Sequence, residues 1–260
     1  MSNSLLPTGL ESTLTFLRSL LADRLATARV VAKHIPAAKV GDHLEYVDLN
    51  QIDGSAAKTH RLDLQLLEET FELTVRELRD AQHAVAKLKA DTAIVAFCRR
   101  EERLILDPPE TTPRAGGGKG GLKQEDIIST ITREALALVR DVDPKSIIVL
   151  VDNDAYGMLS QSMQPTHANS GITYLEGQKN LRIGVIVAVD GLSVREGVMF
   201  GTDTNTSAAA GTAGVLIDRA EGILPECAWD GWNADNLKFS IRSTLAIRVK
   251  NKKAFRKITV

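Results

Sequence analysis

The segment from Arg61 to Leu106 changes its hydrophobic period partway along, and this change constrains the fold more than any other feature of the chain. Phe71, Leu73 and Val75 alternate with polar residues, which is the period-2 pattern of a strand with one buried face. From Ala81 onward the spacing becomes helical. The apolar positions of this helical part are Val85, Leu88, Val95, Cys98 and Ile105.

The charged residues of the helical part fall between these apolar positions, and we expect them to face solvent. They are Lys87, Lys89, Arg99, Arg100, Glu101 and Glu102. The same segment also fits a near-heptad beginning at about Leu66, which would make it one continuous helix. The β-branched and aromatic content of TFELTV favours a strand, and its threonines weaken a coiled-coil seam. We therefore expect a half-buried strand followed by one long amphipathic helix, with the continuous helix as the alternative.

Composition and charge narrow the class of protein. The chain has 260 residues, of which 43% are apolar and 25% charged, enough for one large domain or two small lobes. A net charge of −1 argues against a general nucleic-acid-binding surface, and 4% aromatic content argues against stacking platforms for bases or sugars. Cys98 and Cys227 form neither a disulfide framework nor a metal motif, which favours a reducing compartment.

An amphipathic helix is expected near the N-terminus, from Glu11 to Ala28. Its apolar stripe consists of Leu14, Leu17, Leu21 and Leu25. Charged residues interrupt the apolar run, so the segment is neither a signal peptide nor a membrane span. Because the stripe precedes the main core, we expect it to pack across a neighbouring subunit as an arm.

A long polar hairpin is expected between Lys39 and Leu66. Its tip is the turn-rich stretch from Ile52 to His60, which contains Asp53, Gly54 and Lys58. The hairpin has too few apolar residues to fold alone against water, so it needs support from another surface.

The second half of the chain alternates helices and strands. We expect helices over 124–140 and 155–160, and strands over 146–151, 181–189 and 196–200. The stretch CAWDGW is expected to form a turn, and the last 24 residues to form a strand pair ending at Val260. This order indicates an α+β fold in which the end of the chain comes back to the domain that contains the long helix.

Two carboxylates offer the main alternative chemistry. Asp152 and Asp154 follow the strand SIIVLV, a position where α/β enzymes place metal-binding carboxylates. We interpret Asp154 instead as the N-cap of the next helix. The loop GGGKGG lacks the Ser or Thr of a phosphate-binding motif, and the histidines lack metal-ligand spacing. An α/β enzyme with an acidic metal site at Asp152 and Asp154 remains the alternative from another class.

The order of elements resembles the tailed-phage major capsid fold, which encapsulin shell proteins share. The resemblance covers about 30–260 and rests on ETFELTVREL, PKSIIVLVDNDAYGML, VDGLSVREGVMFGT and the ending LAIRVKNKKAFRKI, in that order. It implies an N-terminal arm (1–30), an extended-loop hairpin (31–66), a peripheral domain with a long spine helix (67–120), a central α/β domain (121–235) and C-terminal strands that return to the peripheral domain (236–260).

The resemblance also implies a structural protein without cofactor, metal or enzymatic activity. It points to a subunit that assembles with many copies of itself into an icosahedral shell. The first reading is a viral major capsid protein enclosing a genome, in a virion assembled in the host cytoplasm; the alternative is a cytoplasmic encapsulin-type nanocompartment enclosing cargo enzymes. Scaffolding, portal or decoration proteins are expected partners, the contents are held without sequence-specific contacts, and no membrane is involved. The expected assembly residues are Leu14, Leu17, Leu21, Leu25, Asp53, Gly54 and Lys58.

Overall fold

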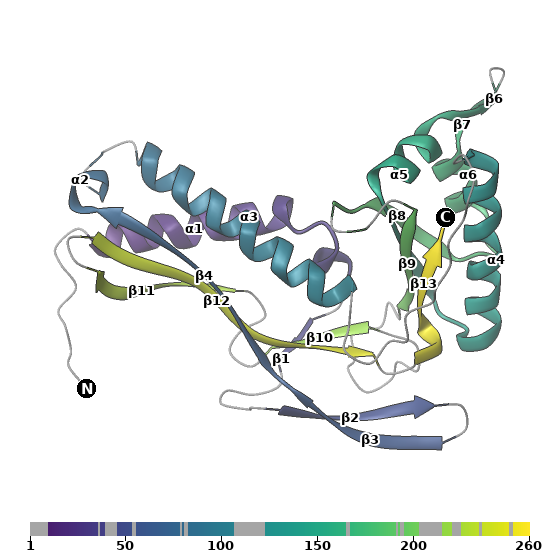
Figure 1. Cartoon of the computed structure of the whole chain (residues 1–260), viewed down its shortest axis with the longest axis horizontal. Helices are drawn as coiled ribbons and strands as arrows, with labels where there is room; N and C mark the ends of the chain where they lie inside the picture. The colour runs from purple at the N-terminus through teal and green to yellow at the C-terminus, as the bar shows by residue number, and fades with distance from the viewer. Residues whose placement is uncertain are drawn as a thin grey trace.

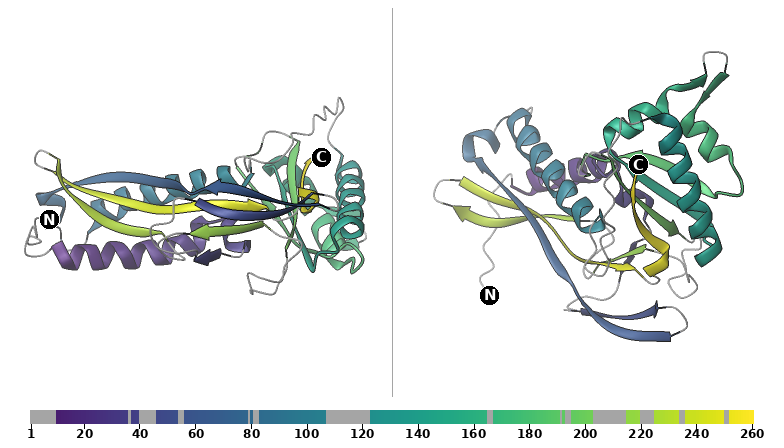
Figure 2. Two further views of the ribbon diagram at one scale, coloured as in Figure 1. Left: turned by 90° about the horizontal axis from the view of Figure 1, so that it is seen from below. Right: turned by 45° about the vertical axis from the view of Figure 1, so that its right-hand side comes forward.

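The computed structural model describes residues 10–35, 37–39, 46–53, 56–78, 80, 83–106, 123–164, 167–190, 192, 195–202, 215–219, 225–233, 236–249 and 252–260. They form an elongated peripheral lobe, a compact central lobe and a two-stranded hairpin (Figure 1). The two lobes lie end to end along the long axis of the subunit (Figure 2).

The peripheral lobe is built on one long strand, β12 (Asn236–Val249). Strand β4 (Gln65–Thr74) runs antiparallel along one edge of β12. On the other edge, β11 (Glu226–Asn233) pairs with the first half of β12 and β10 (Val215–Arg219) with the second half. The short strand β1 (Ala37–Lys39) adds to β10 in parallel.

Two helices, α1 (Leu10–Ala28) and α3 (Ala84–Leu106), cover this sheet. Helix α3 packs on β4 and β12, while α1 packs on α3 and β11. Phe71 and Phe239 are register partners on the covered face, and their rings stack with centroids 5.4 Å apart. The predicted strand-then-helix order is therefore confirmed and the continuous helix is wrong. A short helix, α2 (Val75–Leu78), separates the two elements.

The leucine stripe of α1 lies in the subunit's own core. Leu14, Leu17, Leu21 and Leu25 are between 1% and 7% exposed and belong to the same apolar cluster as the sheet. The expectation that these four side chains pack on a neighbouring subunit is therefore corrected. The physical reason is that α3 and β11 already present an apolar surface to α1, which local sequence does not reveal.

The buried face of α3 also differs from the expected one. Val85, Leu88 and Val95 are 40%, 68% and 41% exposed, although the sequence predicts them to be buried. The packed face instead carries three small residues together with larger ones: Ala86, Ala90, Ala93, Ile94, Phe97, Cys98, Glu101, Glu102, Ile105 and Leu106. The small alanine side chains let α3 pack closely against its neighbours. The face that carries Val85, Leu88 and Val95 is therefore left outside.

The central lobe contains a second sheet in the order β13-β9-β5-β8. Strand β5 (Ser146–Val151) pairs in parallel with β8 (Ile183–Ala188) and antiparallel with β9 (Glu196–Thr202). Successive residues of β5 enter two different cores: Ile148 and Leu150 join the cluster shared with the peripheral lobe, whereas Ile147, Val149 and Val151 join the cluster beneath the central helices. A strand buried on both faces explains why SIIVLV is continuously apolar.

Helices α4 (Gln124–Val142), α5 (Asn153–Ser160) and α6 (Gly171–Gly177) form the outer layer of the central lobe. The small hairpin of β6 (Ser162–Gln164) and β7 (His167–Ser170) extends beyond α5 and α6 (Figure 1). The predictions of a helix over 124–140 and of strands at 146–151, 181–189 and 196–200 are confirmed within two residues at each end.

One prediction near the C-terminus is wrong, and another is right for β12 and wrong for the last strand. CAWDGW is part of strand β11, whose register shifts between Trp229 and Gly231. Gly231 has a φ of 106°, a conformation that glycine adopts readily, so a turn-like sequence fits a bulged strand. The final strand β13 (Phe255–Thr259) pairs with β9 in the central sheet, after the short helix η2 (Lys252–Ala254), and does not return to the peripheral lobe.

A buried ion pair joins the end of α1 to α3. Arg29 Nε lies 2.8 Å from Glu101 Oε2, and Arg29 Nη2 donates to Glu101 Oε1 at 3.0 Å. Glu101 is fully buried, and Glu102 beside it is 8% exposed, so the expectation that both glutamates face solvent is corrected. Each of the two carboxylates has a partner across the interface, and this pairing makes their burial tolerable.

We expect Glu101→Ala to lower the free energy of unfolding by about 3–5 kcal/mol, because the substitution leaves the Arg29 guanidinium buried without its partner. Arg29→Met combined with Glu101→Leu removes both charges and should recover most of that loss. Denaturant unfolding followed by circular dichroism measures both. A Glu101→Ala protein that unfolds at the wild-type midpoint would show that the buried ion pair of Arg29 and Glu101 does not stabilise the fold.

Candidate assembly surfaces

The extended hairpin forms a two-stranded sheet of its own. Strands β2 (Tyr46–Asp53) and β3 (Ala56–Asp63) pair only with each other among the described strands, and β3 continues into β4 after a single residue. The ribbon leaves the body of the subunit below β10 and β12 (Figures 1 and 2). An isolated two-stranded ribbon is marginally stable in water, so this element is suited to a contact with another surface.

The expected tip residues fall partly on the paired strands. Asp53 is the last residue of β2 and is the register partner of Ala56, while Lys58 is opposite Gln51. The turn is therefore narrower than the predicted stretch from Ile52 to His60. Gly54 lies outside the described residues.

A second candidate surface is the outer stripe of α3. Val85, Leu88 and Val95 lie near one line along the helix, together with the exposed residues Thr92 and Arg99. Leu88 is the most exposed of the large apolar side chains in the described residues. The sequence predicts an apolar stripe here, but only the structure shows that it faces outward.

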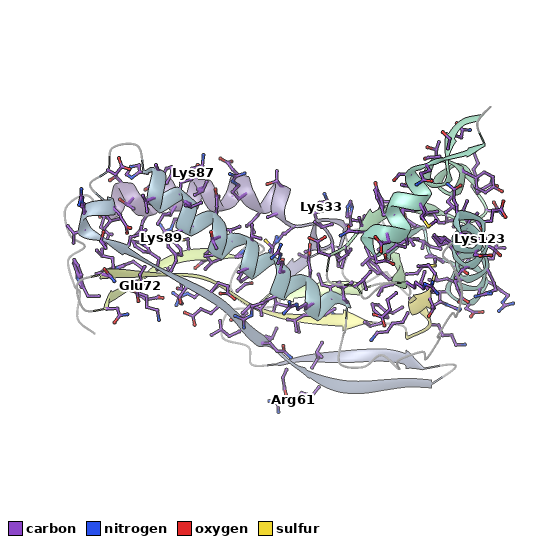
Figure 3. The ribbon with its side chains drawn as sticks, turned by 45° about the horizontal axis from the view of Figure 1, so that its top comes forward. Lys33, Arg61, Glu72, Lys87, Lys89 and Lys123 are labelled. Atoms are coloured by element: carbon purple, nitrogen blue, oxygen red, sulfur yellow. The ribbon has the colours of Figure 1, made fainter. Side chains whose placement is uncertain are left out.

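The free edge of β4 is covered by basic side chains from α3. Lys89 Nζ donates to the Glu72 carbonyl at 3.1 Å and to the Glu77 carboxylate at 2.9 Å. Arg100 Nη1 donates to the Glu68 carbonyl at 2.7 Å. Figure 3 shows Lys89 directed toward β4 and Lys87 directed away from the sheet. These bonds occupy carbonyl groups that would otherwise be open to pairing with another strand, so β4 is protected against edge-to-edge association.

The carboxylates considered for a metal site have other roles. Asp152, which is 4% exposed, caps α5 by accepting bonds from the amides of Asp154 and Ala155 through Oδ1, at 2.9 and 3.1 Å. Its other oxygen accepts from the Arg195 amide at 2.9 Å. The N-cap is thus Asp152, and the prediction of Asp154 is wrong by two residues. Within the described residues, no three metal-ligating side chains come together.

The two cysteines are buried and unbonded to each other. Burial raises the pKa of the Cys227 thiol to about 11, so this thiol is protonated and unreactive at neutral pH. Cys98 is 1% exposed in the α3 core, as expected of a small apolar residue. No described helix is long and apolar enough to cross a membrane.

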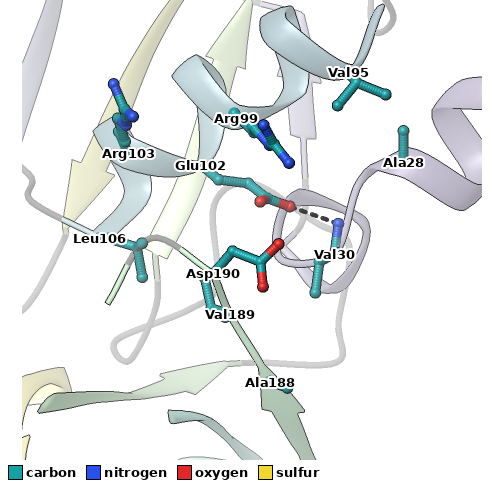
Figure 4. A pocket seen from close by; sticks show the side chains of 10 residues that line it. All are labelled: Ala28, Val30, Val95, Arg99, Glu102, Arg103, Leu106, Ala188, Val189 and Asp190. Atoms are coloured by element: carbon teal, nitrogen blue, oxygen red, sulfur yellow. Dashed lines mark hydrogen bonds between the residues drawn. The ribbon is translucent and has the colours of Figure 1, made fainter. Parts of the chain in front are cut away.

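A cavity of about 460 Å³ lies where the two lobes meet (Figure 4). It is lined by the end of α1, the second half of α3 and the end of β8: Ala28, Val30, Val95, Arg99, Glu102, Arg103, Leu106, Ala188, Val189 and Asp190. Glu102 Oε1 accepts from the amides of Val30 and Val31, at 2.5 and 2.9 Å. Asp190 accepts a bond from Asn153 at 2.6 Å. The sequence gives no local signal for this site, because its parts come from segments far apart in the chain.

Comparison with solved structures shows that the fold is shared with shell proteins. The subunit superposes on the virus-like particle protein from Pyrococcus furiosus with a TM-score of 0.72 and 17% identity, over 93% of this chain and 97% of the other. A phage-related protein from Bordetella bronchiseptica gives 0.60 and 12%, over 94% and 96%. The encapsulin of Synechococcus elongatus gives 0.59 and 11%, over 88% and 86%.

These likenesses confirm the predicted α+β fold of phage capsid and encapsulin subunits. No protein-family model matches the sequence, and no curated protein shows significant similarity to it. The shared fold therefore extends over nearly the whole chain. Because the sequence identities are low, the comparison establishes the fold alone.

The corrected position of the leucine stripe changes the expected effect of charging it. Leu17→Asp with Leu21→Asp should unfold the subunit, because each buried leucine contributes about 1.5–3 kcal/mol through burial alone and a buried carboxylate adds a further cost. Leu88→Asp on the exposed stripe is the matched control and should leave the melting temperature nearly unchanged. Circular dichroism melts compare the variants; a folded double variant would return α1 to the role of an intersubunit arm.

Proposed function

We propose that the protein is a structural subunit that assembles with many copies of itself into a closed icosahedral shell. The observation that carries this proposal is the β2–β3 hairpin, which pairs with no other described strand, on a subunit whose fold is shared with shell proteins. A two-stranded ribbon that pairs with no other described strand gains stability when a neighbour covers it, and obligate interfaces commonly bury about 2,000 Å² or more. Repetition of such a heterologous contact closes when the subunits are related by rotation.

Two readings of the shell follow from the comparisons. Virus-like particle, phage-related and gene-transfer-agent capsid proteins share the fold, which supports a capsid enclosing a genome. An encapsulin complex shares it as well, which supports a compartment enclosing cargo proteins. Scaffolding, portal or decoration proteins belong to the first reading. Mass spectrometry and a nucleic-acid assay of nuclease-treated particles distinguish the two readings of the shell. A capsid retains protected nucleic acid, whereas a compartment retains co-purified protein.

The proposal requires that the purified protein form large closed particles. Negative-stain electron microscopy and analytical ultracentrifugation test this directly. A monodisperse monomer or dimer at all pH and salt conditions, with partner proteins present, would contradict the proposal.

Shortening the hairpin should separate folding from assembly. Val47 and Leu62 are register partners, so residues 48–61 can be replaced by an Asn-Gly turn that keeps the buried Leu62 and does not strain the chain. We expect subunits that keep their melting temperature within a few degrees but no longer close into shells. The control is Arg61→Gln with Asp63→Asn, which removes the exposed ion pair of 3.4 Å and keeps the hairpin. Normal shells from the shortened protein would show that the hairpin is not an assembly element.

A further inference from the structure

The cavity between the lobes brings together two carboxylates from different parts of the fold. Glu102 extends from the spine helix α3 of the peripheral lobe, and Asp190 follows β8 of the central lobe. Their carboxylates point into the same space (Figure 4). Neither carboxylate belongs to the hairpin or to the outer stripe of α3, although Val95 and Arg99 of that stripe also line the cavity. The assembly surfaces therefore leave the pairing of the two carboxylates unexplained.

Charged groups from every adjoining element surround Glu102. Helix α3 itself contributes Arg99 and Arg103, which line the cavity, and Glu101, which is held by Arg29. The short helix η1 (Ala32–His34), which follows the amides bound by Glu102, carries Lys33 and His34. The charges facing Glu102 therefore include two carboxylates, Glu101 and Asp190, and the Arg29 guanidinium is bound to Glu101.

We propose that Glu102 and Asp190 form a proton-sensitive lock between the two lobes. When both are ionised, their repulsion holds the cavity open. When Glu102 takes up a proton, its O–H donates to the Asp190 carboxylate while its other oxygen continues to accept from the amides of Val30 and Val31. The end of β8 is then drawn onto α3 and the lobes become more firmly coupled.

The direction of the pH dependence follows from proton linkage. Burial raises the pKa of Glu102, and the charges of Glu101 and Asp190 raise it further, against the lowering effect of the two amide bonds. A carboxyl with a raised pKa in the folded protein binds its proton more tightly there than in the unfolded chain. Its ionised form therefore costs stability at neutral pH, and this cost is relieved as the pH falls through the raised pKa. The junction should be tighter in mild acid than at pH 8.

Hydrogen exchange of the free subunit tests the lock without requiring a shell. The readout is the exchange of peptides containing Val30, Val31 and Asp190 at pH 5 and pH 8, corrected for the intrinsic pH dependence of exchange. Wild-type protein should be better protected at pH 5, with a change of at most about tenfold per pH unit for a single proton. Glu102→Gln should be equally protected at both values, because its neutral amide donates to Asp190 as the protonated acid does.

Asp190→Asn provides a second variant that removes the repulsion from the other lobe and keeps an oxygen to accept from Asn153. It should weaken the pH dependence without abolishing it, because burial still raises the pKa of Glu102. Glu125→Gln, an exposed carboxylate of α4, is the matched control and should behave as the wild type. The lock is overturned if Glu102→Gln and Asp190→Asn keep the wild-type pH dependence. The role of the lock in setting subunit shape within a shell rests on the proposed function. The exchange test uses free subunits, so a failure to form particles would leave its result unchanged.

Discussion

Strand β12 is the element on which the rest of the subunit depends, because both of its edges are paired. Its first ten residues pair with β4 on one side, while β11 and β10 share the other side. Its buried face carries Phe239, Ile241 and Leu245 into the core beneath α1 and α3. After β12 the chain crosses into the central lobe as β13. One segment near the C-terminus therefore organises one sheet and completes the other, so neither lobe is complete until the whole chain is present.

Local patterns were sufficient wherever a segment's environment is dictated by its own period. The change from alternation to helical spacing located β4 and α3, and the uniformly apolar SIIVLV located a strand buried on both faces. They failed where the outcome depends on a distant partner. Leu17 is buried because α3 and β11 lie beside it, and β13 joins the central sheet because β9 offers an edge. The sequence around Leu17 and around β13 carries no signal for these distant partners.

The candidate site shows the same division. The hairpin was predicted because its low apolar content is a local property, although its paired strands reach closer to the tip than expected. Glu101 and Glu102 were expected in solvent because charged residues are rarely buried. Their burial depends on Arg29 and on the amides of Val30 and Val31, which lie about 70 positions away in the chain. The face of α3 is set by these distant partners, which is why Leu88 lies outside and two glutamates lie inside.

Burial of charge at the junction also relates the shape of the subunit to its assembly. The hairpin and β12 belong to the peripheral lobe, whereas α4 and the central sheet lie on the other side of the cavity. Contacts between subunits that involve both lobes therefore depend on the angle between the two lobes. A core made only of packed apolar side chains would fix that angle, because close-packed interiors resist small displacements. The cavity lined by Glu102 and Asp190 replaces part of that packing with charge. The junction is consequently the place where a change in protonation acts on the relation between the lobes, beside the apolar cluster that spans both of them.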